Sequence, residues 1–443
     1  MSRSQLDHEQ VNAWLMAVSP RDLLPPRRRD ATAPPMSARP ADLMSLGVGL
    51  ALAVAGIERG FVIVPVAGDA MTVRRAVAGD GVYAAILGAI RAERGTGAFR
   101  GEAFGRAPDL IDDAEVAIDV DQSNDSIIVG GRAVVKLFPI ASPGPHPGLD
   151  LPVHLASVGF TSLPAPLGAL RWTSPGDDDL VLATASTFLP GAKDGWDWYL
   201  DLLVGWLDGE VDDLNAFEPA TTLGGICAHM HAAFATASEV FPEPVSAADA
   251  ATADGWRRSA FAVADEALEV TDGPEGARLA ARTEAIRAEL DRLGRGTGAV
   301  TTQVHGDFHV GQVLQWQGGY AIADFDGNPT AAAAVRGFRD TPVRDVAAFV
   351  RSIDHLGRVA QQRRLDRDDS VERWIAASRA RFLDAYVRGL DELDASSSFE
   401  ERLLRPIEVA QACHEYVYAA RYLPRWRSVA DRAMRALIPM EDR

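Results

Sequence analysis

Lysine is nearly absent from this sequence. Of its 44 basic residues only two, Lys136 and Lys193, are lysines, and the others are arginines. The codon bias of a GC-rich genome explains the general replacement. It does not explain why a position keeps lysine, because arginine is a poor substitute where a compact point charge is required. The two lysines are therefore candidates for a chemical role.

Cysteine, positive charge and long apolar runs are also scarce. The two cysteines, Cys227 and Cys413, are too few for a disulfide framework or a cysteine-based zinc site. The net charge of −18 argues against a protein that coats nucleic acid, although a few well-placed cations suffice for a phosphate site. The longest apolar run, residues 46–57, falls short of the ~20 residues that span a bilayer, and the chain opens without a signal-peptide pattern. We therefore expect a cytoplasmic protein, a monomer or weak dimer, with no nucleic-acid or membrane partner.

A length of 443 residues exceeds what one hydrophobic core fills, so more than one packed unit is expected. Residues 1–112 form a predicted N-terminal cap without a reactive constellation of side chains. Residues 113–190 form a predicted β-rich lobe, with strands at 114–120, 126–129, 133–138 and 180–188 and a helix at 149–158. Residues 191–443 follow a mainly helical pattern. The helices expected there are 196–207, 219–235, 250–270, 274–293, 343–361, 373–393 and 400–422.

Two short motifs carry the strongest chemical signal. Residues 305–312 read HGDFHVGQ, and residues 324–327 read DFDG after one strand, a turn and another strand. Phosphoryl transfer to a hydroxyl needs one carboxylate that orients the acceptor and takes its proton, and another that holds magnesium against phosphate oxygens. Asp307 lies five residues before the amide side chain of Gln312, and Asp324 opens the second motif. Together and in this order, the motifs favour a kinase. The alternative is that the two aspartates only cap turns and the histidine is a hydrogen-bonded residue of a loop.

These motifs closely resemble the aminoglycoside-phosphotransferase-like kinases, in particular the maltokinases and the actinobacterial glucosamine kinases. The resemblance covers residues 113–430 and rests on residues 305–314, 324–329 and 342–347. It implies an α+β, bilobal protein-kinase-like fold, with a small β-rich lobe and a large helical lobe after the N-terminal cap. It also implies ATP and Mg²⁺ as cofactors and a small-molecule sugar as acceptor. The roles it implies are a catalytic base for Asp307, magnesium ligation for Gln312 and Asp324, and support of the catalytic loop for His305 and Asp345.

The resemblance also implies a nucleotide site. Lys136 would contact the α- and β-phosphates, and Asp150 from the following helix would orient it. Taken by itself, a lysine in mid-strand is more often a side chain that reaches solvent, but the scarcity of lysine and the downstream motifs reverse that preference. The backbone of residues 187–189 would bind adenine, unless it is an ordinary strand-to-helix turn. The nucleotide residues implied are Lys136, Ser123, Asn124, Ser126, Asp150, Thr187, Phe188 and Leu189.

The acceptor site is expected on the C-terminal helix. Gln411, His414, Glu415 and Tyr418 follow one another at i, i+3, i+4 and i+7, which places all four on one face. A solvated face is the usual explanation of such a stripe, but maltokinases bind sugar with residues of this region. A carboxylate beside neutral hydrogen-bond partners suits the ammonium group of an aminosugar.

The maltokinase pattern has a Tyr-Glu pair where this chain has His414, Glu415 and Tyr416, although Arg421, Pro424 and Trp426 agree with it. Glucosamine, phosphorylated to glucosamine 6-phosphate, is therefore the predicted acceptor, with maltose and aminoglycoside antibiotics as alternatives. A hypothesis of a different class is an inactive kinase fold that acts as a binding module. The presence of Asp307, Asp324 and Lys136 argues against it. The tryptophans of residues 194–198 are interpreted as packing anchors rather than a sugar platform. His309, Asp326 and Asn328 receive no role from the sequence.

Overall fold

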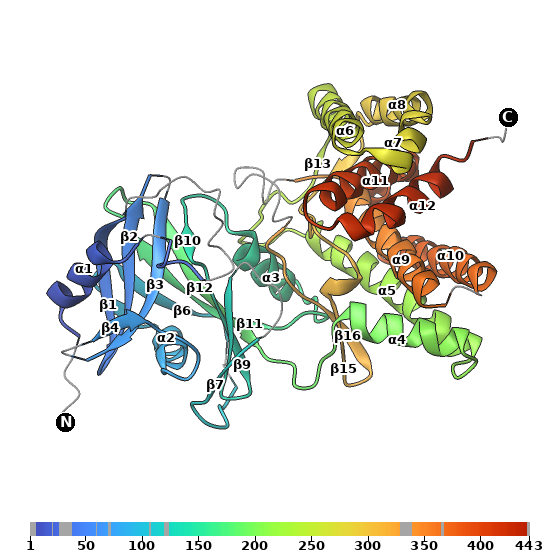
Figure 1. Ribbon diagram of the computed structural model, residues 1–443. Coiled ribbons are helices and arrows are strands. Elements are labelled where there is room, and N and C mark those ends of the chain that lie inside the picture. The colour runs from blue at the N-terminus through green and yellow to red at the C-terminus, as the bar shows by residue number, and fades with distance from the viewer. Residues whose placement is uncertain are drawn as a thin grey trace. The chain divides into compact units, whose positions relative to one another are not determined.

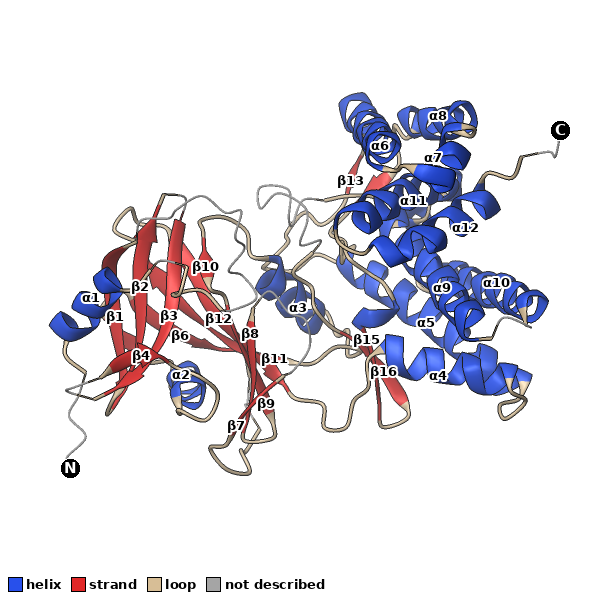
Figure 2. Cartoon of the chain, viewed as in Figure 1, coloured by secondary structure: helices blue, strands red, loops and turns tan. Residues whose placement is uncertain are grey.

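The computed structural model describes residues 6–19, 21–25, 38–58, 60–69, 72–105, 108–118, 124–327, 339–364 and 367–440. The chain divides into two compact units, the first comprising Met1–Val153 and Pro164–Gly191, the second His154–Leu163 and Ala192–Arg443. Sheets dominate the first unit and helices the second (Figures 1 and 2). The predicted α+β class is thereby confirmed. Within the described residues, no helix combines the length and the apolar character that a membrane crossing requires.

A five-stranded sheet forms one layer of the first unit. Its strands are β1 (Arg39–Gly47), β2 (Leu50–Ile57), β3 (Gly60–Gly68) and β10 (Ile140–Ala141), in that order, with β4 (Val73–Arg75) also paired to β3. Side chains of β2 alternate between two cores, because successive residues of a strand point to opposite faces. Ala51 and Ala53 meet the helix α1 (His8–Ala17), whereas Leu52 and Val54 join the larger core on the other face. The apolar run at residues 46–57 thus spans the end of β1, a turn and β2, and β2 is buried on both faces.

A seven-stranded antiparallel sheet forms the second layer. Its order is β5 (Gly95–Thr96), β6 (Phe99–Ala103), β11 (Pro166–Thr173), β12 (Asp179–Thr187), β9 (Ala133–Leu137), β8 (Asp125–Val129) and β7 (Glu115–Ala117). β6 lies within residues 1–112, and it pairs directly with β11. Strands from the predicted cap and from the predicted β-rich lobe therefore share one sheet and one hydrophobic core.

The buried carboxylate of Glu115 supports the helix α2 (Val82–Arg91) of this unit. Its two oxygens accept backbone N–H groups from Gly79 at 2.9 Å, from Gly81 at 3.0 Å and from Ala84 at 2.9 Å. The first N–H groups of a helix have no partner within the helix, and a negative charge there is favourable. Glu115 thus links the edge strand β7 to the start of α2.

We expect Glu115→Ala to lower the free energy of unfolding by about 2–3 kcal/mol, because it leaves three backbone donors of a partly buried turn without their charged acceptor. Urea unfolding followed by tryptophan fluorescence measures the change. Glu102→Ala is the matched control. Glu102 pairs with Arg171 at 2.8 Å but is 41% exposed, so its loss is expected to cost less than about 1 kcal/mol. Equal losses for the two variants would contradict the capping role.

Helices build the second unit. They are the end of α3 (Pro147–Ser157), α4 (Gly195–Leu207), α5 (Asp213–Phe234), α6 (Ala250–Val270), α7 (Gly273–Ala280), α8 (Thr283–Asp291), α9 (Val343–Arg363), α10 (Asp368–Glu392), α11 (Leu404–Arg421) and α12 (Arg427–Leu437). Two small two-stranded sheets accompany them, β13 (Ser246–Ala247) with β14 (Val300–Thr301) and the hairpin of β15 (Val313–Trp316) and β16 (Gly319–Ile322). The periodicity predicts one helix over 274–293, where the structure has α7 and α8. It places the start of α5 at Pro219, whereas the helix begins at Asp213, after the N-cap Asp212.

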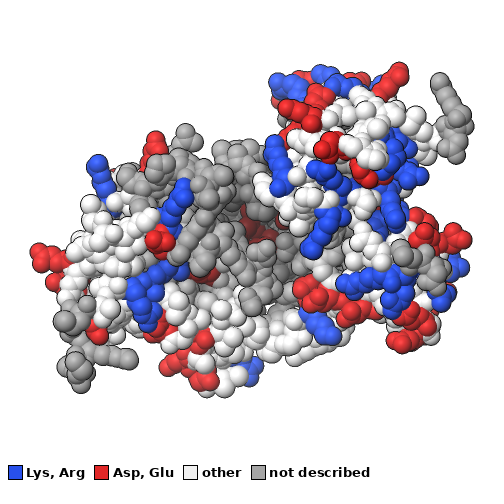
Figure 3. Space-filling model, viewed as in Figure 1, with Lys and Arg blue, Asp and Glu red and all other residues white. Residues whose placement is uncertain are grey.

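Charged side chains on the face drawn in Figure 3 are mixed in sign over the helices of the second unit. The ion pairs of this unit include Arg364 with Asp208 at 2.6 Å and Arg427 with Asp272 at 2.6 Å. The excess of acidic residues therefore does not form a continuous single-sign surface on that face.

Candidate active site

One buried carboxylate holds the catalytic loop predicted from the sequence in place through hydrogen bonds to its backbone. Asp345, in the first turn of α9, is 1% exposed and accepts the backbone N–H groups of His305 at 2.7 Å and Gly306 at 2.9 Å. His231 of α5 lies 3.3 Å from the same carboxylate, and its other ring nitrogen contacts the Tyr386 hydroxyl of α10 at 2.7 Å. Burial by itself would raise the pKa of Asp345, but the His231 hydrogen bond and the neighbouring imidazoles and N–H group outweigh it and hold that pKa below its usual value. Three helices thus fix the backbone just before Asp307.

His305 joins the loop to the second motif. It is fully buried, and its Nε2 lies 3.0 Å from the carbonyl oxygen of Ala323, the residue before Asp324. Donation to that carbonyl places the proton on Nε2, so Nδ1 accepts the N–H of Asp307, at 3.4 Å. The ring of Phe325 lies 4.7 Å from the His305 ring. These contacts of His305 join the two motifs.

Asp307 itself lies at the surface of this assembly. Its side chain is 30% exposed, and burial against the loop, together with the charges of Asp324 and Asp345, raises its pKa to about 6, although His305 and a hydrogen bond from Gln312 act in the opposite direction. Above that pH the group is a carboxylate that can accept a proton. A base whose pKa lies near the working pH is the form that general base catalysis favours.

His309 completes the wall beside Asp307. Its Nδ1 accepts the N–H of Gly311 at 3.0 Å, so a neutral ring carries its proton on Nε2, which lies 3.9 Å from Asp307 Oδ2. Burial, followed by the nearby imidazoles of His305 and His355, lowers the pKa of His309 to about 4. The ring is therefore neutral at pH 7. The sequence assigned it no role, and the structure places it next to the predicted base.

Gln312 and Asp324 offer oxygen atoms of the kind that magnesium binds. The backbone carbonyl of Gln312 accepts the N–H of Ala323 at 2.9 Å, which brings the two candidate ligands to neighbouring positions. Asp324 is exposed and has a φ of +62°, a left-handed conformation that residues with a side chain rarely adopt and that clusters at functional sites. The described residues contain no group of three or more His, Cys, Asp or Glu side chains arranged for a metal. Gln312 and Asp324 would supply one amide and one carboxylate oxygen, and oxygen atoms are the ligands that Mg²⁺ prefers.

Two glycines let the start of α4 approach the catalytic loop. A Cβ atom on Gly195 would lie 1.8 Å from the carbonyl oxygen of Val310, and one on Gly311 would lie 2.6 Å from Nε1 of Trp196. Trp198, the second tryptophan of this segment, is buried and donates its Nε1–H to the carbonyl of Val313 at 3.1 Å, as a packing anchor does. Trp196 is only partly buried and lies beside the His309 ring, at 6.2 Å between centroids.

In the first unit, the predicted phosphate-binding residues lie on adjacent strands. Lys136 is half-buried in the middle of β9, opposite Ser126 of β8 and Thr184 of β12. Asn124 immediately precedes β8, whereas Ser123 lies outside the described residues, as does Asn328 of the second motif. The hairpin of β8 and β9 therefore places Ser126 directly across from Lys136.

The other predicted nucleotide residues make local contacts within the same unit. Asp150 accepts the backbone N–H of His146 at 2.9 Å, at the start of α3. Thr187 accepts the N–H of Ala165 through its hydroxyl at 2.9 Å, and the N–H of Phe188 bonds to the carbonyl of Arg132 at 2.8 Å. An adenine contact from this segment would therefore use the Phe188 carbonyl or the backbone of Leu189.

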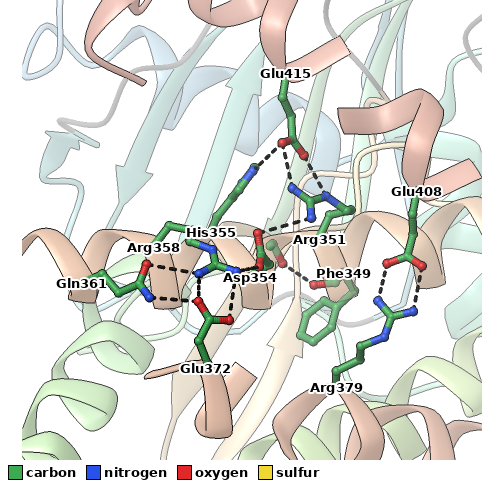
Figure 4. Close-up of polar contacts among 11 residues, drawn as sticks. Phe349, Arg351, Asp354, His355, Arg358, Gln361, Glu372, Arg379, Glu408 and Glu415 are labelled. Atoms are coloured by element: carbon green, nitrogen blue, oxygen red, sulfur yellow. Dashed lines mark hydrogen bonds and ion pairs between the residues drawn. The ribbon is translucent and has the colours of Figure 1, made fainter. Parts of the chain in front are cut away.

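The predicted acceptor residues lie on α11, and one of them has partners that the sequence did not reveal. The Glu415 carboxylate pairs with Arg351 and His355 of α9 (Figure 4). The only sequence signal for these partners is their spacing of four residues within a predicted helix, which places them on one face. Gln411 donates to the carbonyl of Arg344 at 3.3 Å, and its Oε1 has no hydrogen-bond partner among the described residues. His414 is half-buried, and Tyr418 is exposed.

A series of rings connects the catalytic loop to Glu415. The ring of Trp196 lies next to that of His309. The centroid of the Trp196 ring also lies 6.4 Å from that of the Trp426 ring. The His355 ring lies 6.1 Å from that of Trp426, and its Nε2 is 2.9 Å from Glu415 Oε2. Asp307 and Glu415 therefore lie at the two ends of one wall of aromatic and imidazole side chains.

Two curated proteins are similar to this chain over most of its length. The glucosamine kinase of Streptacidiphilus jiangxiensis is 40% identical over 437 residues, which are 96% of this chain and 97% of that protein. The glucosamine kinase of Mycolicibacterium smegmatis is 33% identical over 365 residues, 82% of this chain and 90% of that protein. This chain belongs to the glucosamine kinase family. The membership predicted from its two motifs is confirmed.

Solved structures of the family agree with the fold. A glucosamine kinase in crystal form B matches with a TM-score of 0.85 and 37% identity, over 97% of this chain and 99% of that one. A glucosamine kinase in complex with glucosamine, ADP and inorganic phosphate matches with a TM-score of 0.82, at the same identity and coverage. No family model matches the sequence.

The close contact between α4 and the catalytic loop yields a test that does not depend on activity. Gly195→Ala is expected to force residues 305–312 away from α4, because its Cβ would overlap a backbone carbonyl. Amide hydrogen exchange in that loop should become about tenfold faster, as local opening becomes easier. Gly225→Ala in α5 is the control, since a Cβ there meets nothing within 4 Å. Unchanged exchange in Gly195→Ala would contradict the arrangement.

Proposed function

We propose that this protein is an ATP- and Mg²⁺-dependent kinase that transfers a phosphoryl group to the 6-hydroxyl of glucosamine. The observation that carries the proposal is the braced loop, in which Asp345 holds the backbone before Asp307 while His305 ties Asp307 to the segment of Asp324. Membership of the glucosamine kinase family supports the acceptor.

In the proposed mechanism Asp307 orients the acceptor hydroxyl and takes its proton. The carboxylate form prevails at neutral pH because its raised pKa, about 6, is still below 7. Gln312 and Asp324 are the oxygen donors that we assign to Mg²⁺, which when bound supplies positive charge to the phosphate oxygens. Lys136 is assigned to the nucleotide phosphates, together with the other residues named for that site: Ser123, Asn124, Ser126, Asp150, Thr187, Phe188 and Leu189.

The acceptor is assigned to the face of α11. Arg351 and His355 outweigh the effect of burial and lower the pKa of Glu415 to about 2, so this carboxylate remains charged at any physiological pH. A charged carboxylate is a strong hydrogen-bond acceptor for the 2-ammonium group of glucosamine. Gln411, whose buried Oε1 has no hydrogen-bond partner among the described residues, is assigned to the acceptor site as well. His414 and Tyr418 are assigned to the remaining hydroxyl groups.

Asp307→Asn tests the chemical step. We expect kcat to fall by about two to four orders of magnitude, because an amide neither takes the proton nor orients the hydroxyl as a carboxylate does. The affinity for nucleotide, measured by calorimetry, and the melting temperature should stay close to those of the wild type. Near-normal turnover would mean that another group is the base.

A panel of acceptors tests the substrate, with ADP release as the measurement. Glucosamine should be the best acceptor, and glucose should be about 10- to 100-fold lower in kcat/KM, because it lacks the charge-assisted hydrogen bond of the ammonium group. N-acetylglucosamine should be poor, since it has no charge and adds bulk, and maltose should be negligible. If maltose were the best acceptor, the enzyme would be a maltokinase, and if an aminoglycoside were, an antibiotic kinase.

A further inference from the structure

One helix supports both ends of the site. Asp345, in the first turn of α9, holds the loop of Asp307, and Arg351 and His355, further along α9, hold Glu415. Along an α-helix the rise is ~1.5 Å per residue, so the two supports are roughly 9–15 Å apart on one rigid element. The geometry of α9 therefore sets the separation between the predicted base and the predicted acceptor carboxylate.

The contacts leave Glu415 little freedom to rotate. Arg351 donates from Nε to Oε1 at 3.1 Å and from Nη2 to Oε2 at 2.9 Å, and His355 Nε2 lies 2.9 Å from Oε2. The side chain of Arg351 is 6% exposed, whereas those of Glu415 and His355 are 18% and 17% exposed. The guanidinium group of Arg351 is thus buried, whereas Glu415 and His355 are both partly exposed to solvent.

A second layer of contacts fixes Arg351 in turn. Its Nη1 lies 3.3 Å from Asp354, which also pairs with Arg358 at 3.0 Å, and Arg358 pairs with Glu372 of α10 (Figure 4). These ion pairs join two guanidinium groups and three carboxylates, counting Glu415.

We propose that Arg351 and His355 are positioning residues that hold the Glu415 carboxylate in the orientation that receives the ammonium group of the acceptor. They thereby determine the preference of this enzyme for an aminosugar over a neutral sugar. The inference rests on the proposed function, because it assumes that Glu415 contacts the acceptor. Without His355, Oε2 loses one of its two donors and Arg351 alone holds the carboxylate, so the ammonium group meets a less firmly placed partner.

A second buried ion pair on α11 provides a matched control. Glu408 lies two turns before Glu415, is 1% exposed and pairs with Arg379 of α10, with Nη2 at 2.7 Å. Glu408→Gln weakens a buried ion pair of the same helix and leaves the hydrogen bonds of Glu415 in place. A purely structural role of His355 would make His355→Ala behave like Glu408→Gln.

The experiment measures KM and kcat for glucosamine and for glucose, at saturating ATP, in the full-length wild type and in His355→Ala, His355→Gln and Glu408→Gln. We expect His355→Ala to raise the KM for glucosamine about tenfold, with kcat and the kcat/KM for glucose within about threefold. His355→Gln should restore most of the loss, because its amide N–H reaches a similar position. Glu408→Gln should lower the melting temperature and leave the KM for glucosamine unchanged.

Two results would overturn the inference while the proposed function stands. One is a His355→Ala enzyme whose KM for glucosamine is unchanged, and the other is an equal loss for glucosamine and glucose. If His355→Ala does not fold, Arg351→Lys decides in its place, since lysine keeps the charge without the two-pronged contact and should again raise the KM for glucosamine selectively. A wild-type enzyme that does not phosphorylate glucosamine would overturn the proposed function, and the inference with it.

Discussion

The two carboxylate oxygens of Asp345, which is buried, accept hydrogen bonds from the backbone of the loop that precedes Asp307. A buried charge is tolerated only when it is paired and hydrogen-bonded, and here the N–H groups and His231 meet that requirement. The same contacts that stabilise the charge also define the path of the loop. The positions of Asp307, of His305 and, through the Ala323 carbonyl, of the Asp324 segment all depend on this arrangement.

The helix α9, which contains Asp345, also carries Arg351 and His355, the partners of the predicted acceptor residue Glu415. Its apolar residues Val346, Phe349 and Ile353 pack into the core of the second unit, so the polar residues between them are carried into a low-dielectric environment. Arg351 and Asp354 are buried for this reason, and they need partners from α10 and α11. A polar network of this kind is rigid because any movement leaves a buried group without its partner.

The resemblance of two short motifs was sufficient to predict the family and the α+β class, and several helices were predicted within a few residues. α6 matches its predicted span, because an unbroken amphipathic period lies between the cap Asp249 and the end at Val270. α5 begins at Asp213, earlier than the predicted start at Pro219, and this proline lies inside the helix. The strand pairing crosses residue 112, because β6 lies before that residue and its partner β11 lies after it. Sequence patterns do not reveal pairing between strands so far apart in the chain.

The sequence by itself predicted the chemistry, since Asp307, Gln312 and Asp324 lie within one stretch of residues 307–324 and their identity and spacing are local properties. It also placed Gln411, His414 and Glu415 on one helix face, because helical periodicity is local too. Only the tertiary structure decided what that face meets. Periodicity tells which residues of a helix lie together, but the partner helix is chosen by packing of the whole core. The pairing of Glu415 with Arg351, 64 residues away, therefore became visible only in the folded chain.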